Sequence, residues 1–332
     1  MSMPSCWIVT EGAAGMESQC RGVAEALGLE PVVKRADPRL FWLILPSRWW
    51  PFPFLAMGGE SDRFEPPWPD FLISCGRKSV AISLAVKRAS GGRTFHIHIQ
   101  DPMMSTAAFD LVAAPHHDGV KGSNVVATRG ALHPITPQKL AAAAEHFRPH
   151  FAKLSRPLVA VLLGGPNGRV RFDERDAARI ADALVRLARE YGAGLALTPS
   201  RRTTEECVRI LRERLSEADA YLWDRKGENP YLGMLALADY ILVTEDSVSL
   251  ASEACATGKP VYVIPLSGGS ARHRRFHEAL RAEGLTRPFA GRLERWSYQP
   301  LFDAARVAEE VRRSLARRAD ANIEVPRAQN RL

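Results

Sequence analysis

Short apolar runs alternate with stretches of helical periodicity along most of the chain, and this alternation limits the possible folds more than any other feature. Strands that are separated by helices pair with one another as parallel sheets. Strand-like runs lie at 6–10, 31–35, 71–75, 95–100, 111–114 and 125–128, and a second series lies at 158–163, 194–198, 220–223, 240–244 and 261–265. The sequence therefore predicts an α/β protein with two Rossmann-like halves, each built on its own sheet.

The boundary between the halves is predicted from helical periodicity and prolines. Helical patterns occupy 17–27, 78–88, 173–191, 203–216 and 303–318. Pro149 and Pro157 stand between the end of a further helical stretch and the strand at 158–163, which favours a linker. We expect an N-terminal domain at 1–148, a C-terminal domain at 149–300, and a C-terminal helix and tail at 301–332 that packs back on the N-terminal domain.

Length and composition exclude several classes of protein. The 332 residues are about twice the ~150 residues of a typical domain. Pro46, Pro51 and Pro53 interrupt the apolar stretch 40–57. The uninterrupted apolar runs are therefore far shorter than the ~20 apolar residues that span a bilayer. The first ten residues lack a basic segment followed by an apolar one, so we expect no signal peptide and a cytoplasmic protein.

The net charge and the positions of cysteine and histidine limit which ligands and partners the chain is expected to bind. The net charge of +8 is spread along the chain, and no RRM, KH or zinc-finger signature occurs, so we expect no nucleic-acid partner. Phosphate-bearing small molecules or an anionic membrane surface suit this charge. The cysteines form no CxxC pair, and His96, His98, His116 and His117 lack a third ligand at metal spacing, so we expect free thiols and no metal.

The first strand ends in a glycine-bearing turn. Glu11 stands at the carboxyl end of this strand, where open α/β sheets bind ligands, and Gly12 and Gly15 lead into a helix that carries Gln19. Backbone N–H groups at such a turn attract anions. We expect Gly12, Gly15 and Gln19 to lie on the acceptor side of a substrate site, although a tight packing turn explains the glycines equally well.

A second glycine turn follows the strand at 158–163. Gly164, Gly165 and Gly168 permit close approach of a phosphate, Asn167 tolerates left-handed geometry, and Arg169 supplies a positive charge. An ordinary loop is the alternative. A third turn after 194–198 carries Ser200, Arg201 and Arg202, and here Thr203 with Glu206 resembles a capping box.

The most informative motif follows the strand at 240–244. Asp246, Ser247 and Ser249 open a helix whose free N–H groups suit an anion. Glu253, four residues after Ser249, shares its helical face. Hydroxyl and N–H groups for a diphosphate, with a carboxylate for a sugar diol, are the parts of a nucleotide-sugar site. A serine-capped helix without a ligand remains the alternative.

These motifs together resemble a known family. They are T-E-G-x-x-G-x-x-x-Q at 10–19, G-G-P-N at 164–167, T-P-S-R-R-T at 198–203, N-P-Y at 229–231 and T-E-D-S-x-S-x-x-S-E-A-x-x-T-G-K-P-V at 244–261. The whole chain resembles bacterial members of the mitochondrial-fission "elongated mitochondria" family, and the last motif resembles the donor half of GT-B glycosyltransferases. The resemblance implies a GT-B-like fold of two Rossmann-like domains facing a central cleft, with Asn229 and Tyr231 on the nucleotide side.

The resemblance implies nucleotide-sugar chemistry, with the nucleotide-sugar as substrate and no cofactor. We expect an inverting, metal-independent glycosyltransferase in which Glu11 is the base and Asp101 the next candidate. Arg169, Arg201, Ser247 and Ser249 would hold the phosphates, and Glu253 the ribose. The chain departs from retaining GT-B enzymes, because Glu245 precedes the turn and shares no helix with Glu253. A non-catalytic scaffold protein and a nucleotide-sugar epimerase or hydrolase are the alternatives.

An aromatic segment at 41–54 holds three of the seven tryptophans. With Arg39 and Arg48 nearby, it suits the interface of an anionic membrane. In that case the acceptor is membrane-associated and the protein peripheral at the inner face of the membrane. A buried lid over the acceptor site is the other interpretation.

Overall fold

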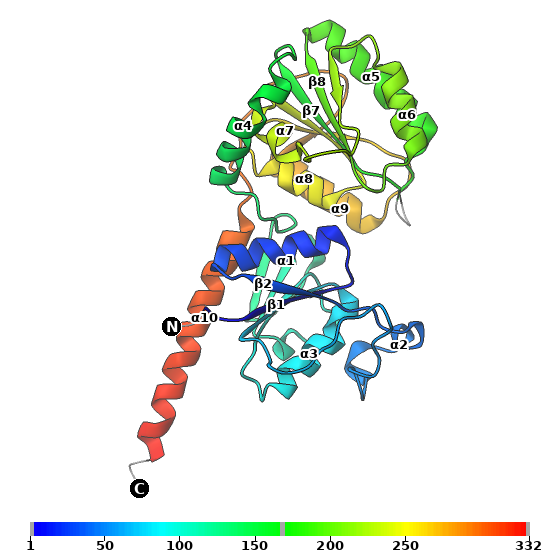
Figure 1. Ribbon diagram of the computed structural model, residues 1–332. Helices are drawn as coiled ribbons and strands as arrows, with labels where there is room; N and C mark the ends of the chain where they lie inside the picture. The colour runs from blue at the N-terminus through cyan, green and yellow to red at the C-terminus, as the bar shows by residue number, and fades with distance from the viewer. Residues whose placement is uncertain (1–2, 167–169, 330–332) are drawn as a thin grey trace. The chain divides into compact units, whose positions relative to one another are not determined.

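The computed structural model describes residues 3–166 and 170–329 and divides the chain into two compact units (Figure 1). The first unit comprises the chain up to Pro134 together with the chain from Phe302 onward, and the second runs from Ile135 to Leu301. Within the described residues each unit contains one six-stranded parallel sheet. The predicted α/β class with two Rossmann-like halves is therefore confirmed.

The first unit places its earliest strand inside the sheet, in the order β2-β1-β3-β4-β5-β6. Its strands are β1 (Cys6–Thr10), β2 (Pro31–Arg35), β3 (Phe71–Cys75), β4 (Phe95–Ile99), β5 (Leu111–Pro115) and β6 (Val125–Thr128). Its helices are α1 (Ala14–Leu27), α2 (Leu40–Ile44), α3 (Val80–Ala89) and α10 (Asp303–Gln329), with 3₁₀ turns η1 (Ser47–Trp49), η2 (Arg77–Ser79), η3 (Thr106–Ala108) and η4 (His116–Asp118).

Both faces of this sheet are covered, which explains why its central strands are apolar throughout. On one face α1 and α10 lie side by side, and Val23, Val307 and Val311 pack with Ile8 of β1 (Figure 1). On the other face Ile82 and its neighbours on α3 pack in a cluster with Trp7, Val9 and Leu72. The apolar stripe of the C-terminal helix thus belongs to the core of the first unit.

The second unit has the strand order β12-β11-β10-β7-β8-β9. Its strands are β7 (Leu158–Leu163), β8 (Gly194–Pro199), β9 (Ala220–Leu222), β10 (Tyr240–Thr244), β11 (Val261–Ile264) and β12 (Thr286–Pro288). Its helices are α4 (Pro137–Phe151), α5 (Glu174–Tyr191), α6 (Glu205–Arg214), α7 (Tyr231–Leu237), α8 (Val248–Cys255) and α9 (Ala271–Ala282). The sequence did not indicate β12, because this edge strand is only 3 residues long.

The boundary between the units lies earlier than the predicted residue 148. The helix α4 belongs to the second unit, and Pro149 is part of that helix rather than of a linker. Its buried residue Phe147 packs so closely on α7 that a Cβ at Gly233 would lie 2.4 Å from the Phe147 Cβ. The packing of the apolar face of α4 therefore places this helix in the second unit, whereas the prolines predicted a boundary after the helix.

Two further findings concern the residues that the structure describes. None of the helices there has the length and apolar character needed to cross a bilayer. The five cysteines are free thiols, and all are buried.

Candidate functional site

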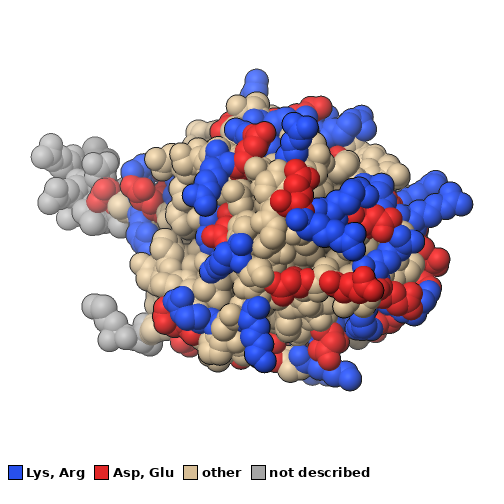
Figure 2. Space-filling model, turned by 90° about the horizontal axis from the view of Figure 1, so that it is seen from above, with Lys and Arg blue, Asp and Glu red and all other residues tan. Residues whose placement is uncertain are grey.

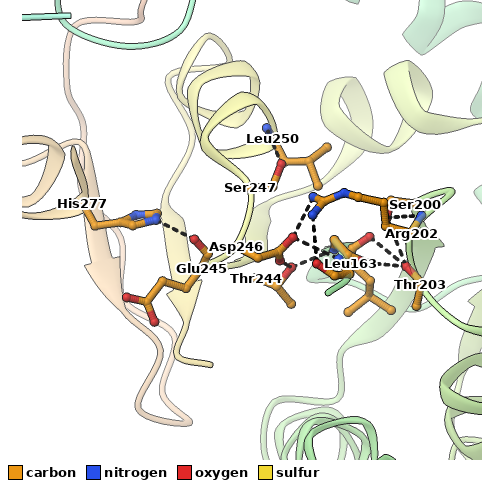
Figure 3. Close-up of polar contacts among 12 residues, drawn as sticks. Leu163, Ser200, Arg202, Thr203, Thr244, Glu245, Asp246, Ser247, Leu250 and His277 are labelled. Carbon is orange, nitrogen blue, oxygen red and sulfur yellow. Dashed lines mark hydrogen bonds and ion pairs between the residues drawn. The ribbon is translucent and has the colours of Figure 1, made fainter. Parts of the chain in front are cut away.

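The carboxyl edge of the second sheet is organised around one buried carboxylate, that of Asp246 (Figure 3). Its oxygens accept hydrogen bonds from the Gly165 N–H at 2.9 Å, the Thr244 hydroxyl at 2.7 Å and the Arg202 guanidinium at 2.8 Å. The loops after β7, β8 and β10 are thereby joined at the point where β7 and β10 lie side by side and the strand order reverses, the usual ligand position in such sheets.

This arrangement corrects the role predicted for Asp246. Its side chain is 0% exposed and its carboxylate is occupied by groups of the protein, so it is a structural residue and not a nucleotide contact. Arg202, which sequence reasoning left without a role, is its partner. The signal in the sequence was the pair Arg201-Arg202 after a strand, but only the fold distinguishes the two.

The glycines after β7 are required by the same packing. A Cβ at Gly164 would lie 2.1 Å from the Asp246 carboxylate, and one at Gly165 would lie 2.3 Å from the backbone of Arg202. Close approach of protein atoms therefore explains these glycines without a phosphate. Asn167 and Arg169, which we expected to bind phosphate, lie outside the described residues.

In the loop after β8, most polar side chains form hydrogen bonds within the protein, whereas one faces the solvent. Thr204, not Thr203, caps α6 by accepting the Cys207 N–H at 3.3 Å, whereas the Thr203 hydroxyl donates to the Leu163 carbonyl at 3.3 Å. The predicted capping box is therefore wrong by one residue. Ser200 accepts the N–H of Arg202 at 3.2 Å. Arg201 is exposed and forms no hydrogen bond or ion pair with any described residue.

The start of α8 has the predicted geometry. Ser247 is the N-cap, and its hydroxyl accepts the Leu250 N–H at 3.3 Å (Figure 3). Ser249 is half-buried in the first turn. Glu245, two residues before the N-cap, is bound by α9, because the His277 ring donates a hydrogen bond to the Glu245 carbonyl oxygen at 2.8 Å. Burial lowers the pKa of His277. A short serine-capped helix therefore begins at the edge where ligands bind.

Glu253 and Tyr231 are brought together from α8 and α7. The Tyr231 hydroxyl donates a short hydrogen bond to the Glu253 carboxylate. Burial, followed by the negative charge of Glu253, raises the pKa of Tyr231 well above its usual value. Asn229, which precedes α7, accepts the Tyr231 N–H at 3.1 Å and so positions this turn. Of the predicted nucleotide residues, these three form a connected group.

Lys259 has the structural role that a position at the end of α8 suggests. Its ammonium donates to the carbonyl oxygens of Leu235 at 2.9 Å and of Ala236, which lie in the last turn of α7. Burial lowers its pKa from 10.5 to about 8. Lys259 therefore connects the C-terminus of α7 with the segment that follows α8.

The carboxyl edge of the first sheet has its own reversal of strand order, between β1 and β3. Glu11 follows β1 and Lys78 follows β3, and the Glu11 carboxylate lies 3.0 Å from the Lys78 ammonium. The Glu11 side chain remains 27% exposed. The sequence identified Glu11 but missed Lys78, whose only signal was its position in the turn after a strand.

The residues expected on the acceptor side have mainly local roles. Gly12 adopts a φ of 88°, which favours glycine, and its N–H donates to the Thr10 hydroxyl at 3.1 Å. Gln19 is buried, and its amide donates to the Gly15 carbonyl at 3.0 Å within α1. Gln19 therefore stabilises the helix, and its place on the acceptor side stays a prediction.

Asp101 lies in a strained turn after β4. Its carboxylate accepts the Met103 N–H at 2.8 Å, and Gln100 and Met103 have positive φ values of 79° and 55°. Left-handed backbone at residues other than glycine is concentrated at functional sites. Turn formation by itself nevertheless accounts for the presence of Asp101.

The histidines on β4 form a buried polar cluster instead of a metal site. The Ser74 hydroxyl lies 2.7 Å from His96 Nε2 and 2.8 Å from His98 Nδ1. Burial lowers the pKa of His98 to about 3 and that of His96 well below its usual value, so both rings are neutral. Among residues 3–166 and 170–329 no cluster of three His, Cys, Asp or Glu side chains has the arrangement of a metal site.

The surface charge is mixed on the face seen in Figure 2, where Lys and Arg side chains alternate with Asp and Glu. A continuous basic field of the kind that follows a nucleic-acid backbone is not present on that face. On that face the basic side chains are therefore interrupted by acidic ones.

Comparison with known sequences relates the chain to one family. The family model described as mitochondrial fission ELM1 matches residues 14–315. The mitochondrial fission protein ELM1 of Arabidopsis thaliana is 34% identical over 282 residues, which cover 77% of this chain and 66% of that protein. The uncharacterized protein RP120 of Rickettsia prowazekii is 28% identical over 287 residues, which cover 74% of this chain and 80% of that protein.

Comparison with solved structures identifies the fold. The UDP-GlcNAc 2-epimerase of Neisseria meningitidis, bound to UDP-GlcNAc, gives a TM-score of 0.56 at 12% identity, covering 95% of this chain and 100% of that one. The epimerase of Methanocaldococcus jannaschii, in complex with UDP-GlcNAc and UDP, gives 0.57 at 14% identity, covering 95% and 99%. At these identities the likeness establishes a GT-B-like fold of two Rossmann-like units and nothing about the reaction.

Proposed function

The chain belongs to the mitochondrial fission ELM1 family and has a GT-B-like fold, and we propose that it is an inverting, metal-independent glycosyltransferase with a nucleotide-sugar donor. The donor binds to the second unit at the start of α8, and the acceptor hydroxyl binds to the first unit at Glu11. Because epimerases with this fold hold UDP-GlcNAc, that compound is the first donor to test.

The observation that carries the proposal is the hydrogen bond between Tyr231 and Glu253, which lies about one turn beyond the start of α8. Unpaired N–H groups and the helix dipole at that start attract a diphosphate, and Arg201 adds an exposed charge without a described partner. Glu253 lies about one turn further along the same helix. Held by Tyr231, its carboxylate is placed to accept hydrogen bonds from the hydroxyls of a ribose.

Glu11 supplies the base that an inverting transfer requires. The acceptor oxygen attacks the anomeric carbon of the donor sugar as its proton passes to the Glu11 carboxylate and the bond to the departing diphosphate breaks. The ammonium of Lys78, 3.0 Å from the Glu11 carboxylate, holds this carboxylate in position. The cation and N–H groups at the start of α8 stabilise the negative charge on the diphosphate.

Calorimetric titration of the full chain with UDP-GlcNAc, UDP, GDP and CMP tests the donor site. We expect at least one of these nucleotides to bind, and Glu253→Gln to weaken its binding by about 10- to 100-fold, as expected for a hydrogen bond to a charged group. Glu217→Gln is the matched control, because Glu217 is exposed and follows α6, at the amino edge of the sheet. Equal affinity in the Glu253→Gln and control proteins would refute the ribose role.

The titration, together with analysis of the products formed with and without an acceptor, separates the alternative functions. Absence of binding by any nucleotide or nucleotide-sugar would favour a non-catalytic scaffold protein. Turnover of the bound donor without an acceptor, detected as epimerised sugar or as free sugar and diphosphate, would favour an epimerase or hydrolase. Only transfer to an added acceptor with inversion at the anomeric carbon would support the glycosyltransferase.

We propose further that the acceptor is presented at a membrane, which the segment 41–54 contacts. Phe41 is 67% exposed, Ile44 77% and Trp49 59%, although Trp50 is buried. A lid would hide these apolar side chains, whereas a membrane interface accepts them. No acidic residue occurs between positions 38 and 59, which suits an anionic surface.

Flotation with vesicles of neutral or anionic phospholipid at low and high salt tests this contact. We expect binding to anionic vesicles that weakens with salt, and loss of binding in Phe41→Ser/Ile44→Ser. Val32→Ser is the control, since Val32 is an exposed apolar residue on the edge strand β2. If the wild-type chain floats under none of these conditions, the membrane proposal is wrong.

A further inference from the structure

A groove of about 410 Å³ lies in the first unit between the aromatic segment and α3. Trp50 and Ser47 contribute one wall, Leu84 of α3 a second, and Met104 and Ala108 a third. The volume falls within the range of about 300–1,000 Å³ that small-molecule sites occupy. Most of the lining side chains are apolar, so the groove suits hydrocarbon.

Two cations, Lys87 and Arg88, line the same groove. Lys87 is already engaged, because its ammonium lies 2.8 Å from the Asp110 carboxylate. Arg88 is exposed, and its guanidinium forms no ion pair or hydrogen bond with any residue that the structure describes. Among the described residues, no acidic side chain lines the groove. One unneutralised arginine beside an apolar cavity is the arrangement that an amphiphile with an anionic head would complement.

The groove continues the apolar surface of the aromatic segment. Ser47 and Trp50 line it, while Phe41 and Ile44, in α2 just before them, are exposed to solvent. The segment carries arginine but no carboxylate. A neutral protein partner would leave the Arg88 charge unpaired, and an acidic protein surface would leave the apolar cavity unfilled. An anionic phospholipid supplies both an acyl chain for the cavity and a negative charge for Arg88.

We infer that this groove binds one acyl chain of an anionic phospholipid, with the headgroup phosphate at Arg88. The inference rests on the proposed membrane contact and deepens it. Besides the surface of segment 41–54 that adsorbs to a membrane, the first unit would have a site for one lipid molecule.

Short-chain phosphatidic acid, kept below the concentration at which it aggregates, tests the groove without a bilayer. Calorimetry should give saturable binding of one lipid per chain. Ala108→Trp fills the cavity and should weaken binding at least tenfold, while Ala107→Trp, at an exposed neighbouring position outside the lining, should not. Circular dichroism and the melting temperature verify that both variants fold.

Arg88→Gln provides a second test that leaves the cavity unfilled. It should weaken phosphatidic acid binding by about tenfold, the loss expected for a charge-assisted hydrogen bond. Phosphatidylcholine of the same chain length should lose far less. Arg93→Gln, another exposed arginine outside the lining, is the control. Equal binding of both lipids, unchanged by Arg88→Gln, would overturn the anionic site.

The outcome separates the groove from the membrane contact. If wild-type protein floats with anionic vesicles but shows no saturable binding of the monomeric lipid, the groove proposal is wrong and the membrane contact stands. If the monomeric lipid binds and flotation fails, the membrane contact is wrong and the groove stands. Loss of lipid binding in Ala108→Trp with retained flotation is the result that supports both.

Discussion

The guanidinium of Arg202 lies 2.8 Å from the carboxylate of Asp246, and this ion pair connects the loop after β8 with the loop after β10. The same carboxylate accepts the N–H of Gly165, which follows β7. One buried charge thus joins three loops of the second unit. The start of α8 is consequently held in position by groups that do not themselves face a ligand.

Arg202→Gln should therefore destabilise the second unit. Removing one partner of a buried ion pair leaves the other charge unpaired, and we expect a loss of about 3 kcal/mol, the low end of the usual range, because Arg202 is 42% exposed. Denaturant unfolding followed by circular dichroism measures the change.

Arg201→Gln is the matched control for this prediction. Arg201 is exposed and contacts no described polar group, so the free energy of unfolding should change by less than about 0.5 kcal/mol. The nucleotide affinity should fall in Arg201→Gln instead. Equal stability of the two variants would contradict the structural role of Arg202.

Gly164→Ala should be destabilising even without a ligand. Its Cβ would lie 2.1 Å from the Asp246 carboxylate, and overpacking of this kind costs about 1–3 kcal/mol. Gly59→Ala is the control, since open space surrounds that position. Thermal unfolding in the absence of nucleotide decides the question. A neutral Gly164→Ala would show that these loops rearrange readily.

Glu11→Gln should lower kcat by about 10²- to 10⁴-fold, the usual contribution of a general base. Nucleotide affinity should be unchanged, because Glu11 and Glu253 belong to different units. Glu17→Gln, which removes only the surface ion pair with Arg21, is the control. Normal turnover in a destabilised Glu11→Gln protein would mean that the Glu11–Lys78 pair is structural, and Asp101 would then be the residue to test.

The buried imidazoles should make the first unit acid-sensitive. The pKa of His98 is lowered to about 3, and below the ordinary value of 6.5 the unfolded chain therefore binds protons that the folded chain does not. Stability is unaffected by these groups above pH 6.5 and should fall as the pH decreases toward 3, by about 1.4 kcal/mol per pH unit for each imidazole.

His98→Gln removes one of these groups and should make that fall shallower by about 1.4 kcal/mol per pH unit. Val32→Ser, at an exposed position of the same unit that carries no titratable group, should leave the slope unchanged. Tryptophan fluorescence is a suitable measurement, since five of the seven tryptophans precede Pro134. Identical slopes in both variants would exclude the buried pair as the cause.

Val307→Ala should destabilise the first unit although it lies near the C-terminus. Val307 is 0% exposed and packs in the cluster that includes Ile8 and Val23. Deleting its methyl groups should cost about 2 kcal/mol, counting lost transfer energy and the cavity. Ala316→Ser, exposed on the same helix, should have little effect. A shift in unfolding of the second unit instead would contradict this packing.

Periodicity alone determined the fold class. The central strands β1, β3, β7 and β10 are buried on both faces, so each is a continuous apolar run that can be recognised without knowing its neighbours. The serine cap of α8 was predictable for a similar reason, because an N-cap bond joins residues that are close in the sequence. The short edge strand β12 and the assignment of α4 were not, since both depend on distant packing partners.

The roles of charged residues were decided by the tertiary structure. Arg201 and Arg202 are neighbours of the same type, yet only Arg202 reaches Asp246, 44 positions away in the sequence. Likewise, Glu11 meets Lys78, and Glu253 meets Tyr231, only when parallel strands bring successive loops to one edge of a sheet. The sequence shows which side chains stand at strand ends. The tertiary structure decides which of these side chains form ion pairs or hydrogen bonds with one another and which are free to bind a ligand, because those contacts form only when the sheets are assembled.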